Sequence, residues 1–378
     1  MAQLRIGLVY GGRSREHEVS LASAASVISH LDPSKYEPVP IRIDRDGRWF
    51  FDHQPPTATS ADQVLKESRQ GHDTVIEPRE LHPVGTNPTG SPTPLLSDLE
   101  LDVVFPVLHG PYGEDGTVQG LLEMADIPYV GAGVLASAVG TDKAFMKKLF
   151  GAKGLPQVLY IVVLERTWKA DTSGVRTEVA KRLGLPVFVK PANLGSSVGI
   201  SKVSSTEQLD AAIELAFAYD RKIIIEAAVP DARDIECAIL GNDETEVSVP
   251  GEAIASREFY DYEAKYLDDS SELCIPAALD PATINQVRQF TTAAFHTIEC
   301  SGMARVDFLI ARATGQLFIN EINTIPGFTT ISMYAKLWAA SGITYSELLD
   351  RLVQLALDRH AAKSERGKNM PQSNNERA

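Results

Sequence analysis

The amino-acid sequence predicts an α/β (α+β) fold of several domains, the first of them built on an open parallel sheet. Short apolar runs that end in glycine alternate with segments that repeat apolar residues at helical spacing. The 378 residues exceed a single ordinary core, since one domain usually holds about 100 to 200 residues. A composition of 44% hydrophobic and 23% charged residues is typical of a globular protein.

The net charge indicates which partners the protein can bind, and the cysteines indicate its cellular compartment. A formal net charge of −14 and the lack of a Lys/Arg run disfavour nucleic acid, because neutralising phosphates needs a clustered basic face. The N-terminal residues lead directly into an apolar strand, so we expect neither a signal peptide nor a membrane span. Cys237, Cys274 and Cys300 lack metal-site spacing, and we interpret them as structural thiols of a cytoplasmic protein.

The first domain is predicted to cover residues 1–131. An apolar run at 4–10 ends at Gly11-Gly12 and is followed by apolar residues at helical spacing, which predicts strand, turn and helix. A second buried-strand pattern at 101–108 ends at His109-Gly110. Residues 53–98 are rich in Pro, Thr, Ser and Asp, and we expect a surface loop there, with room for one hairpin.

Two further domains are expected, a central one at 132–226 and a C-terminal one at 227–360. The patterns predict helices after Asp142, at 206–217, after Asp280-Pro281 and after Thr344, the last two with capping residues at their starts. The polar residues 361–378 are expected to form a disordered tail. Strands are predicted at 158–163, 187–190, 223–226, 234–240, 246–254, 304–310 and 316–323.

The strongest chemical signal lies on the last two predicted strands. Alternation along a strand puts Arg305 and Asp307 on one face, and it does the same for Glu321 and Asn323. If the strands are neighbours, two carboxylates and an amide oxygen gather beside a guanidinium, and hard oxygen ligands of this kind suit Mg²⁺ with nucleotide phosphates. The alternative is a pair of solvated strand faces joined by an Arg–Asp ion pair.

A glycine-rich loop follows the strand that ends at Lys190-Pro191. Residues 193–199 read Asn-Leu-Gly-Ser-Ser-Val-Gly, and the backbone N–H groups of such a loop can hold phosphate oxygens while a lysine neutralises charge. The order of residues is not that of a Walker loop. Taken by itself, the segment could also be an ordinary turn.

Other segments carry weaker signals. Residues 260–266, Tyr-Asp-Tyr-Glu-Ala-Lys-Tyr, have no clean period and are typical either of a functional loop or of a surface loop with incidental aromatics. Glu16 and Glu18 lie between the first strand and first helix, where an α/β sheet binds ligands, although helix capping could explain either residue. His109 ends a strand at the same edge of the sheet and could equally be structural.

Taken in this order along the chain, these segments resemble the D-alanine:D-alanine ligases of the ATP-grasp superfamily, from Arg5 to about His360. The resemblance implies a three-domain ATP-grasp architecture with ATP between the central and C-terminal domains. The matching segments are Gly11-Gly12 with Glu16-His17-Glu18-Val19-Ser20, His109-Gly110 with Gly113-Glu114-Asp115-Gly116, Asp142-Lys143, Lys190-Pro191 with Gly195-Ser196-Ser197-Val198-Gly199, the 260–266 segment, and Glu321-Ile322-Asn323-Thr324 with Pro326-Gly327.

For the nucleotide, the resemblance implies contacts from both ATP-grasp domains. Glu226 would face the adenine and Asp234 the ribose, and two departures from the family pattern, Ala227 for Lys and Asp234 for Glu, bear on nucleotide affinity. Mg²⁺ or Mn²⁺, as two ions, is implied as cofactor. The implied phosphate contacts are Lys143, Lys190, Ser197 and Lys265, and the implied metal ligands are Asp307, Glu321 and Asn323.

For the substrates, the resemblance implies ATP-dependent joining of two D-alanine molecules through an acyl phosphate, in peptidoglycan precursor synthesis. Glu16 and His109 would bind the first D-alanine, and Ser332 with the Met333 backbone would bind the carboxylate of the second. Glu16, Ser196 and Tyr266 would close the 256–271 loop over the site, and Arg305 with the Gly327 N–H would stabilise the oxyanion. A homodimer is also implied.

Three alternatives remain at this point. A D-alanine:D-lactate ligase would share the ATP site but differ in the loop, and the Tyr266 pattern favours an amine. Another ATP-grasp carboxylate–amine ligase would lack the 260–266 segment. A nucleotide-binding regulatory module without turnover would lack a metal ligand or Arg305, and all of these residues are present.

Overall fold

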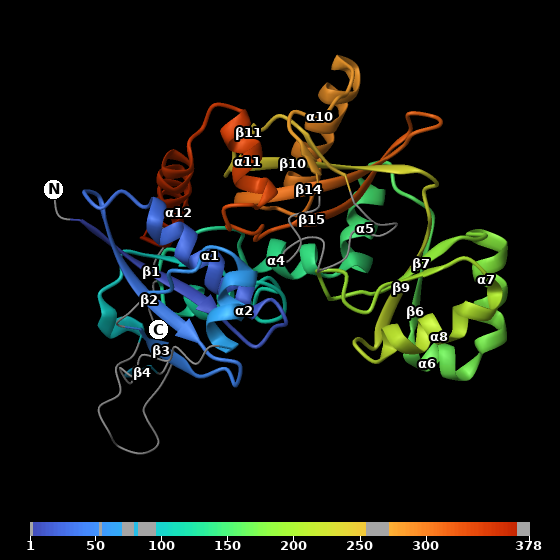
Figure 1. Cartoon of the computed structure of the whole chain (residues 1–378), viewed down its shortest axis with the longest axis horizontal. Helices are drawn as coiled ribbons and strands as arrows, with labels where there is room; N and C mark the ends of the chain where they lie inside the picture. The colour runs from blue at the N-terminus through green and yellow to red at the C-terminus, as the bar shows by residue number, and fades with distance from the viewer. Residues whose placement is uncertain (1–2, 53–54, 70–78, 82–95, 255–271, 369–378) are drawn as a thin grey trace, which may run out of the picture.

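Three β-sheets, each with its own helices, make up the chain in a computed structural model that describes residues 3–52, 55–69, 79–81, 96–254 and 272–368. In Figure 1 the N-terminal sheet lies at the left, the four-stranded sheet at the right and the C-terminal sheet above and between them. The mixed α/β class predicted from the sequence is confirmed. The predicted loop residues Lys265 and Tyr266 lie outside the described residues.

The N-terminal sheet has the strand order β4-β3-β2-β1-β5. β1 pairs in parallel with β2 and with β5, while β3 and β4 add antiparallel strands at one edge, so the sheet is mixed rather than wholly parallel. Its elements are β1 (Leu4–Gly11), α1 (His17–His30), β2 (Tyr36–Ile43), β3 (Trp49–Phe51), α2 (Ala61–Arg69), β4 (Arg79–Leu81), a 3-10 turn η1 (Leu96–Leu99), β5 (Val103–Pro106) and α3 (Thr117–Met124).

The segment expected to be surface loop, residues 53–98, contains more regular structure than its composition suggested. α2 packs against α1 with Ala61 buried, and β4 extends the sheet through β3. A nine-residue helix was missed because its polar sequence carries few of the apolar residues on which helix prediction depends.

The smallest unit is an antiparallel sheet of order β6-β9-β7-β8, covered by three helices. Its core begins at Ile161, later than the predicted boundary at residue 132. The preceding helices α4 and α5 bury Ala136, Met146 and Phe150 in the core of the C-terminal sheet instead. The two preceding helices are α4 (Val134–Thr141) and α5 (Lys143–Ala152). The elements of the four-stranded unit are β6 (Tyr160–Leu164), α6 (Glu165–Ala170), α7 (Thr172–Arg182), β7 (Val187–Pro191), β8 (Ser201–Val203), α8 (Thr206–Phe217) and β9 (Lys222–Ala227).

The C-terminal sheet has the order β13-β12-β10-β14-β15, with β11 paired to β10. The run expected as one strand at 246–254 forms two, β11 and β12, because Pro250 interrupts it. The elements are β10 (Ala232–Gly241), β11 (Thr245–Val247), β12 (Gly251–Ile254), β13 (Glu272–Cys274), α10 (Pro281–Thr297), β14 (Gly302–Ala311), β15 (Leu317–Asn323), α11 (Met333–Ala340) and α12 (Tyr345–Lys368).

The last helix ties the C-terminal unit to the first one. Leu348 and Leu352 of α12 are fully buried in a core that they share with Ile6 and Phe105 of the N-terminal sheet. The tail expected to be disordered from residue 361 begins as a continuation of this helix to Lys368, and Lys363 pairs with Glu123 of α3. The polar composition of this segment gave no indication of its contact with the N-terminal unit.

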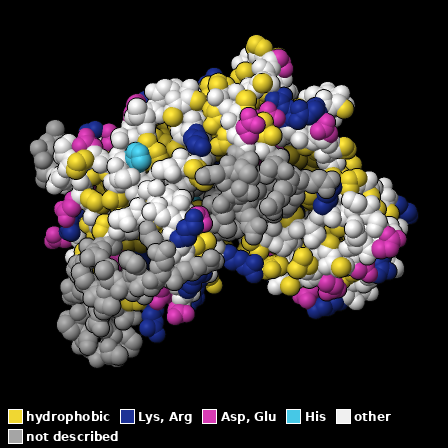
Figure 2. All heavy atoms as spheres, viewed as in Figure 1, with side chains coloured by type: hydrophobic (Ala, Val, Ile, Leu, Met, Phe, Trp, Pro, Cys, Tyr) yellow, Lys and Arg dark blue, Asp and Glu magenta, His cyan; other side chains and the backbone are white. Residues whose placement is uncertain are grey.

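The remaining predictions from composition concern the membrane and the cysteines. Within the part of the chain that the structure describes, no helix is long and apolar enough to cross a membrane. Burial raises the pKa of the Cys237 thiol to about 11 and that of Cys300 to about 12, so both stay protonated and unreactive at neutral pH. The face drawn in Figure 2 intersperses Lys and Arg with Asp and Glu.

Candidate active site

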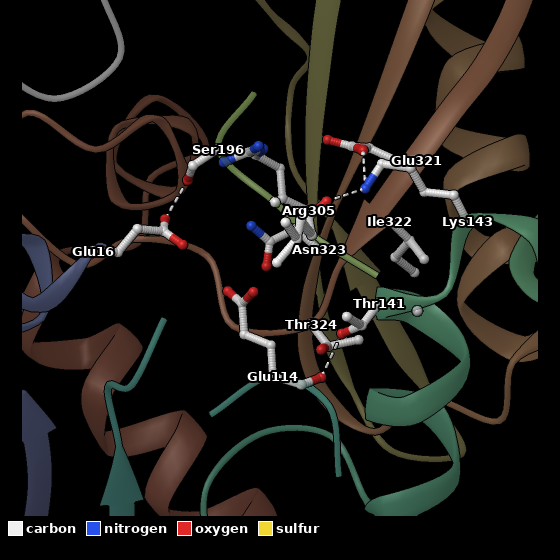
Figure 3. Close-up of a pocket in the computed structure, with 13 residues that line it drawn as sticks. Glu16, Glu114, Thr141, Lys143, Ser196, Arg305, Glu321, Ile322, Asn323 and Thr324 are labelled. Atoms are coloured by element: carbon white, nitrogen blue, oxygen red, sulfur yellow. Dashed lines mark hydrogen bonds and ion pairs between the residues drawn. The ribbon is translucent and has the colours of Figure 1, made fainter. Parts of the chain in front are cut away.

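A polar pocket lies where the three units meet. Its walls come from the loop before α1, the turn after β5, the α4–α5 junction, the glycine-rich loop after β7, and the ends of β14 and β15 (Figure 3). Side chains distant in sequence therefore point at one space. The lining residues are Glu16, Glu114, Gly140, Thr141, Lys143, Leu194, Gly195, Ser196, Arg305, Glu321, Ile322, Asn323 and Thr324.

The three predicted metal ligands lie on adjacent antiparallel strands. Asp307 of β14 is directly opposite Glu321 of β15, and Arg305 is opposite Asn323, so the pairing assumed from the alternation is present. A bulge follows Asp307 and shifts the register beyond it. Two carboxylates and an amide oxygen thus stand together, which is an oxygen donor set suited to Mg²⁺.

Arg305 lies at the centre of a buried ion-pair network on these strands. Its Nε and Nη2 donate to the two oxygens of Asp307, each at 2.7 Å, and its Nε lies 2.8 Å from Glu236 Oε2 on β10. The Arg–Asp ion pair offered as the alternative to a metal site therefore exists as well. Because a carboxylate has about four lone-pair positions, Asp307 keeps capacity for another ligand.

Glu16 and the glycine-rich loop approach each other across the pocket. The Ser196 hydroxyl donates to Glu16 Oε1, joining the N-terminal unit to the four-stranded one. Ser196 and Ser197 both have positive φ, 51° and 59°, a conformation that costs energy in non-glycine residues and is concentrated at functional sites. Gly110, at φ 75°, is also required: a Cβ there would lie 3.1 Å from Glu16 Oε2.

His109 is buried beside the pocket residue Glu114, and Ser23 links it to the C-terminal unit. Its Nε2 lies 3.2 Å from the Ser23 hydroxyl, and Ser23 Oγ also accepts the backbone N–H of Phe328 at 3.3 Å. Its Nδ1 lies 3.8 Å from Glu114 Oε1. Burial alone lowers the pKa of His109, but Glu114 and Glu16 outweigh it and raise the pKa above its ordinary value.

The two lysines predicted to bind phosphate lie where the four-stranded sheet meets the C-terminal sheet. Lys143 opens α5, donates its Nζ to the Leu194 carbonyl at 2.6 Å and lies 3.6 Å from Glu321. Lys190 is the penultimate residue of β7, and its Nζ lies 2.6 Å from Glu226 Oε2 on β9. Asp234 is half-buried near Lys190 and, after Glu226 and Glu321, helps to raise that lysine's pKa against the effect of burial.

The segment after β15 carries the remaining predicted residues. Gly327 is buried, and Phe328 beside it packs edge-on to Phe105 at 5.5 Å. Ser332 is the N-cap residue of α11, and Met333 is its first residue. The first N–H groups of a helix lack intrahelical partners and favour a carboxylate, so this end of α11 is suited to bind one.

Several residues of the site were not singled out from the sequence. Glu114 lies beside His109, and Glu236 pairs with Arg305. Ser23 joins His109 to the loop after Gly327. Lys147, one turn after Lys143, pairs with Glu226 at 2.9 Å. Glu114 was within a quoted motif and Lys147 had helical spacing from Lys143, but Ser23 and Glu236 had no local signal because their partners are distant in sequence.

Two protein-family models match this chain and show the family to which it belongs. The model for "D-ala D-ala ligase N-terminus" matches residues 5–132, and the model for "D-ala D-ala ligase C-terminus" matches residues 149–354. The chain belongs to the D-alanine–D-alanine ligase family. It is therefore an enzyme of the ligase class, and the resemblance stated from the sequence is confirmed.

Individual relatives of the family cover nearly the whole chain. The D-alanine–D-alanine ligase of Heliobacterium modesticaldum is 48% identical over 96% of this chain and 97% of its own. The solved D-alanine–D-alanine ligase of Coxiella burnetii matches with a TM-score of 0.82 and 36% identity over 97% of this chain and 98% of that one. The solved VanG D-Ala:D-Ser ligase of Enterococcus faecalis matches with a TM-score of 0.76 and 32% identity over 94% and 100%.

The two matched segments contain most of the predicted site residues. Glu16 and His109 fall in the segment matched by the N-terminal model, and the site residues from Lys190 to Met333 fall in that matched by the C-terminal model. Lys143 lies between the two matched segments, at the start of α5. In this D-alanine–D-alanine ligase family member, then, the pocket is assembled by both matched regions and by α4 and the start of α5 between them.

Proposed function

We propose that this enzyme joins two D-alanine molecules into D-alanyl-D-alanine at the expense of ATP, as a step of peptidoglycan precursor synthesis. The observation that carries the proposal is one pocket holding Glu16, Arg305 and the pair Glu321 and Asn323. A carboxylate suits a substrate ammonium, and a guanidinium beside oxygen ligands suits phosphates. These are the parts needed to activate a carboxylic acid and then attack it with an amine.

The reaction proceeds in two steps. A carboxylate is a poor electrophile, so an oxygen of the first D-alanine carboxylate attacks the γ-phosphorus of ATP, giving an acyl phosphate and ADP. The amine of the second D-alanine then attacks the acyl carbon, loses a proton and expels inorganic phosphate. Lys143, Lys190 and Ser197, with Lys265, bind the nucleotide phosphates.

Substrate binding is divided between the first unit and the C-terminal one. Glu16, held by Ser196, binds the ammonium of the first D-alanine, with the buried His109 close enough to feel the Glu16 charge. The start of α11, at Ser332 and the Met333 N–H, binds the carboxylate of the second. Arg305 and the Gly327 N–H stabilise the tetrahedral oxyanion. Closure by the loop that carries Tyr266 would exclude water from the acyl phosphate.

Divalent metal fits the donor set on β14 and β15. Asp307, Glu321 and Asn323 would hold Mg²⁺ or Mn²⁺, as two ions, and the metal would supply charge neutralisation for the nucleotide phosphates. Asn323 Oδ1 accepts the Ile325 N–H at 3.0 Å, which restrains the orientation of the amide. Such orientation by neighbouring groups is usual at metal sites.

One assay tests the proposed reaction. The purified enzyme is supplied with ATP, Mg²⁺ and D-alanine, and phosphate release is measured while the product is identified by mass. We expect D-alanyl-D-alanine with one phosphate per dipeptide, and neither phosphate nor dipeptide with L-alanine. Phosphate release without dipeptide, or a different product as the main species, would overturn the proposal.

The identity of the second substrate is the part of the proposal most open to variation within the family. The likeness to a solved D-Ala:D-Ser ligase gives D-serine as a second candidate. The same assay therefore contains competition arms with D-alanine plus D-serine and D-alanine plus D-lactate at neutral pH. We expect the D-alanyl-D-alanine dipeptide to dominate in each arm; a depsipeptide or a serine-terminated product in excess would reassign the second subsite.

We further propose that the enzyme is a cytoplasmic homodimer. The cysteines are free thiols, which suits a reducing compartment. Adjacent helices α3 and α4 expose Met124 (84%), Val134 (41%) and Leu135 (57%), and an apolar surface of this kind is typical of a subunit interface. Light scattering should give twice the chain mass, and Leu135→Glu should give the mass of one chain while Leu159→Glu, exposed outside these helices, should not.

A further inference from the structure

A buried carboxylate in the nucleotide region is held by two lysines rather than one. Glu226 Oε1 lies 2.9 Å from Lys147 Nζ of α5, and Glu226 Oε2 lies 2.6 Å from Lys190 Nζ of β7. The Glu226 side chain is 4% exposed and that of Lys147 is 1% exposed. The cluster therefore contains two ammonium groups and one carboxylate that are largely shielded from water.

The charges in this cluster depend on one another. Burial favours a neutral Glu226, but the ammoniums of Lys147 and Lys190 outweigh it and hold the pKa of the carboxyl well below its usual range. Burial and the nearby Lys190 charge lower the pKa of Lys147, and Glu226 opposes them. An ionised buried carboxylate that lost its only counter-ion would be strongly unfavourable.

The two lysines differ in what else they can reach. The Lys190 side chain is 11% exposed, precedes the glycine-rich loop, and also feels the charges of Glu321 and Asp234. Lys147 is enclosed, with its ammonium 5.8 Å from the Tyr160 ring centre. The more exposed Lys190 can therefore turn toward a ligand in the site, whereas the Lys147 side chain is enclosed beside Glu226.

We propose that Lys147 is a positioning residue that acts as the permanent counter-ion of Glu226, so that Lys190 can leave Glu226 and bind nucleotide phosphate. The inference rests on the proposed function, in which Lys190 is a phosphate ligand. When Lys190 turns away, Lys147 keeps the carboxylate neutralised and in place. Without Lys147, Lys190 would be the remaining cationic partner of Glu226 among the residues that the structure describes, and nucleotide binding would have to break that pair.

The first measurement is ADP affinity by calorimetry with Mg²⁺, which involves no turnover. We expect Lys147→Met to raise the Kd for ADP more than tenfold, while the KM for D-alanine in the dipeptide assay stays within twofold. The matched control is Lys148→Met, the next residue on the same helix, whose side chain is exposed. Lys148→Met should bind ADP as the wild type does. Unchanged ADP affinity in Lys147→Met would overturn the proposal.

A double-mutant cycle separates this role from packing. Glu226→Gln removes the anion that competes for Lys190, so adding Lys147→Met to it should change the Kd for ADP by less than twofold. An equal, more than tenfold loss in both backgrounds would mean that Lys147 acts by packing or by direct attraction of phosphate, and would overturn the proposal. The double variant leaves no unpaired buried carboxylate, so it remains measurable if Lys147→Met alone unfolds.

The cycle can be distinguished from a failure of the proposed function. The cycle measures only the Kd for ADP, whereas the product assay shows which substrate is joined. A wild-type enzyme that binds ADP but forms no dipeptide would overturn the proposed substrate alone. A wild-type enzyme that does not bind ADP at all would overturn both.

Discussion

Glu321→Gln is expected to lower kcat by roughly a thousandfold, on the order of 4 kcal/mol in the activation barrier. The substitution keeps the shape of the side chain but removes the charge that would hold a divalent cation opposite Asp307. It also removes the acid that lies 3.6 Å from the Lys143 ammonium. Both changes act where charge develops on the transferred phosphoryl group.

The fold should survive this change. The Glu321 side chain is 28% exposed and lies in the pocket rather than in a core, so the midpoint of thermal unfolding should stay close to that of the wild type. The Mg²⁺ concentration for half-maximal activity should rise. Glu244→Gln, an exposed acid at the β10–β11 turn, serves as the control. Full activity of Glu321→Gln would remove the metal assignment.

Arg305→Met is expected to reduce kcat by about a thousandfold and to destabilise the fold as well. The guanidinium is the shared partner of Asp307 and Glu236, so its loss leaves two buried carboxylates facing each other without that cation. Removing one partner of a buried ion pair costs about 3 to 5 kcal/mol, and removing an oxyanion donor costs about 10²- to 10³-fold in rate. Thermal unfolding and single-turnover kinetics measure the two effects separately.

Two comparison variants make the Arg305 result interpretable. Arg312→Met, just beyond the same strand, removes an exposed guanidinium paired with Asp231 and should alter neither kcat nor the unfolding midpoint appreciably. Arg305→Lys keeps the charge but not the two-point contact with Asp307, so stability should recover more than kcat. If Arg305→Met retained wild-type kcat at a temperature where it is folded, the oxyanion role would be wrong.

Much of the fold followed from local patterns in the chain. Buried strands such as 223–226 and capped helices such as the one after Asp280 form where the apolar period and the caps predict them. Two of the errors share a cause. α2 and the extension of α12 to Lys368 are polar helices stabilised by contacts such as Lys363 with Glu123, and local composition does not contain those contacts.

Local patterns likewise predicted only part of the candidate site. Alternation along two strands was enough to place Asp307 with Glu321 once the strands were assumed to pair, and that pairing is present. The pattern could not choose between an ion pair and a metal site, and the structure contains Arg305 against Asp307 in the same place as the oxygen donors. Local patterns alone could not indicate that Ser196 meets Glu16, 180 positions away, but the family resemblance grouped these two residues and the hydrogen bond between them is present.

By itself, the sequence determined the class of fold, the residue types of the site and the family, because periodicity, caps and motif order are local properties of the chain. Only the tertiary structure decided that Glu226 has Lys147 and Lys190 on its two oxygens, and that Ser23 joins His109 to the backbone beside Gly327. Such contacts arise where separate units pack together. Burial then turns ordinary polar side chains into charges and hydrogen bonds that depend on their neighbours.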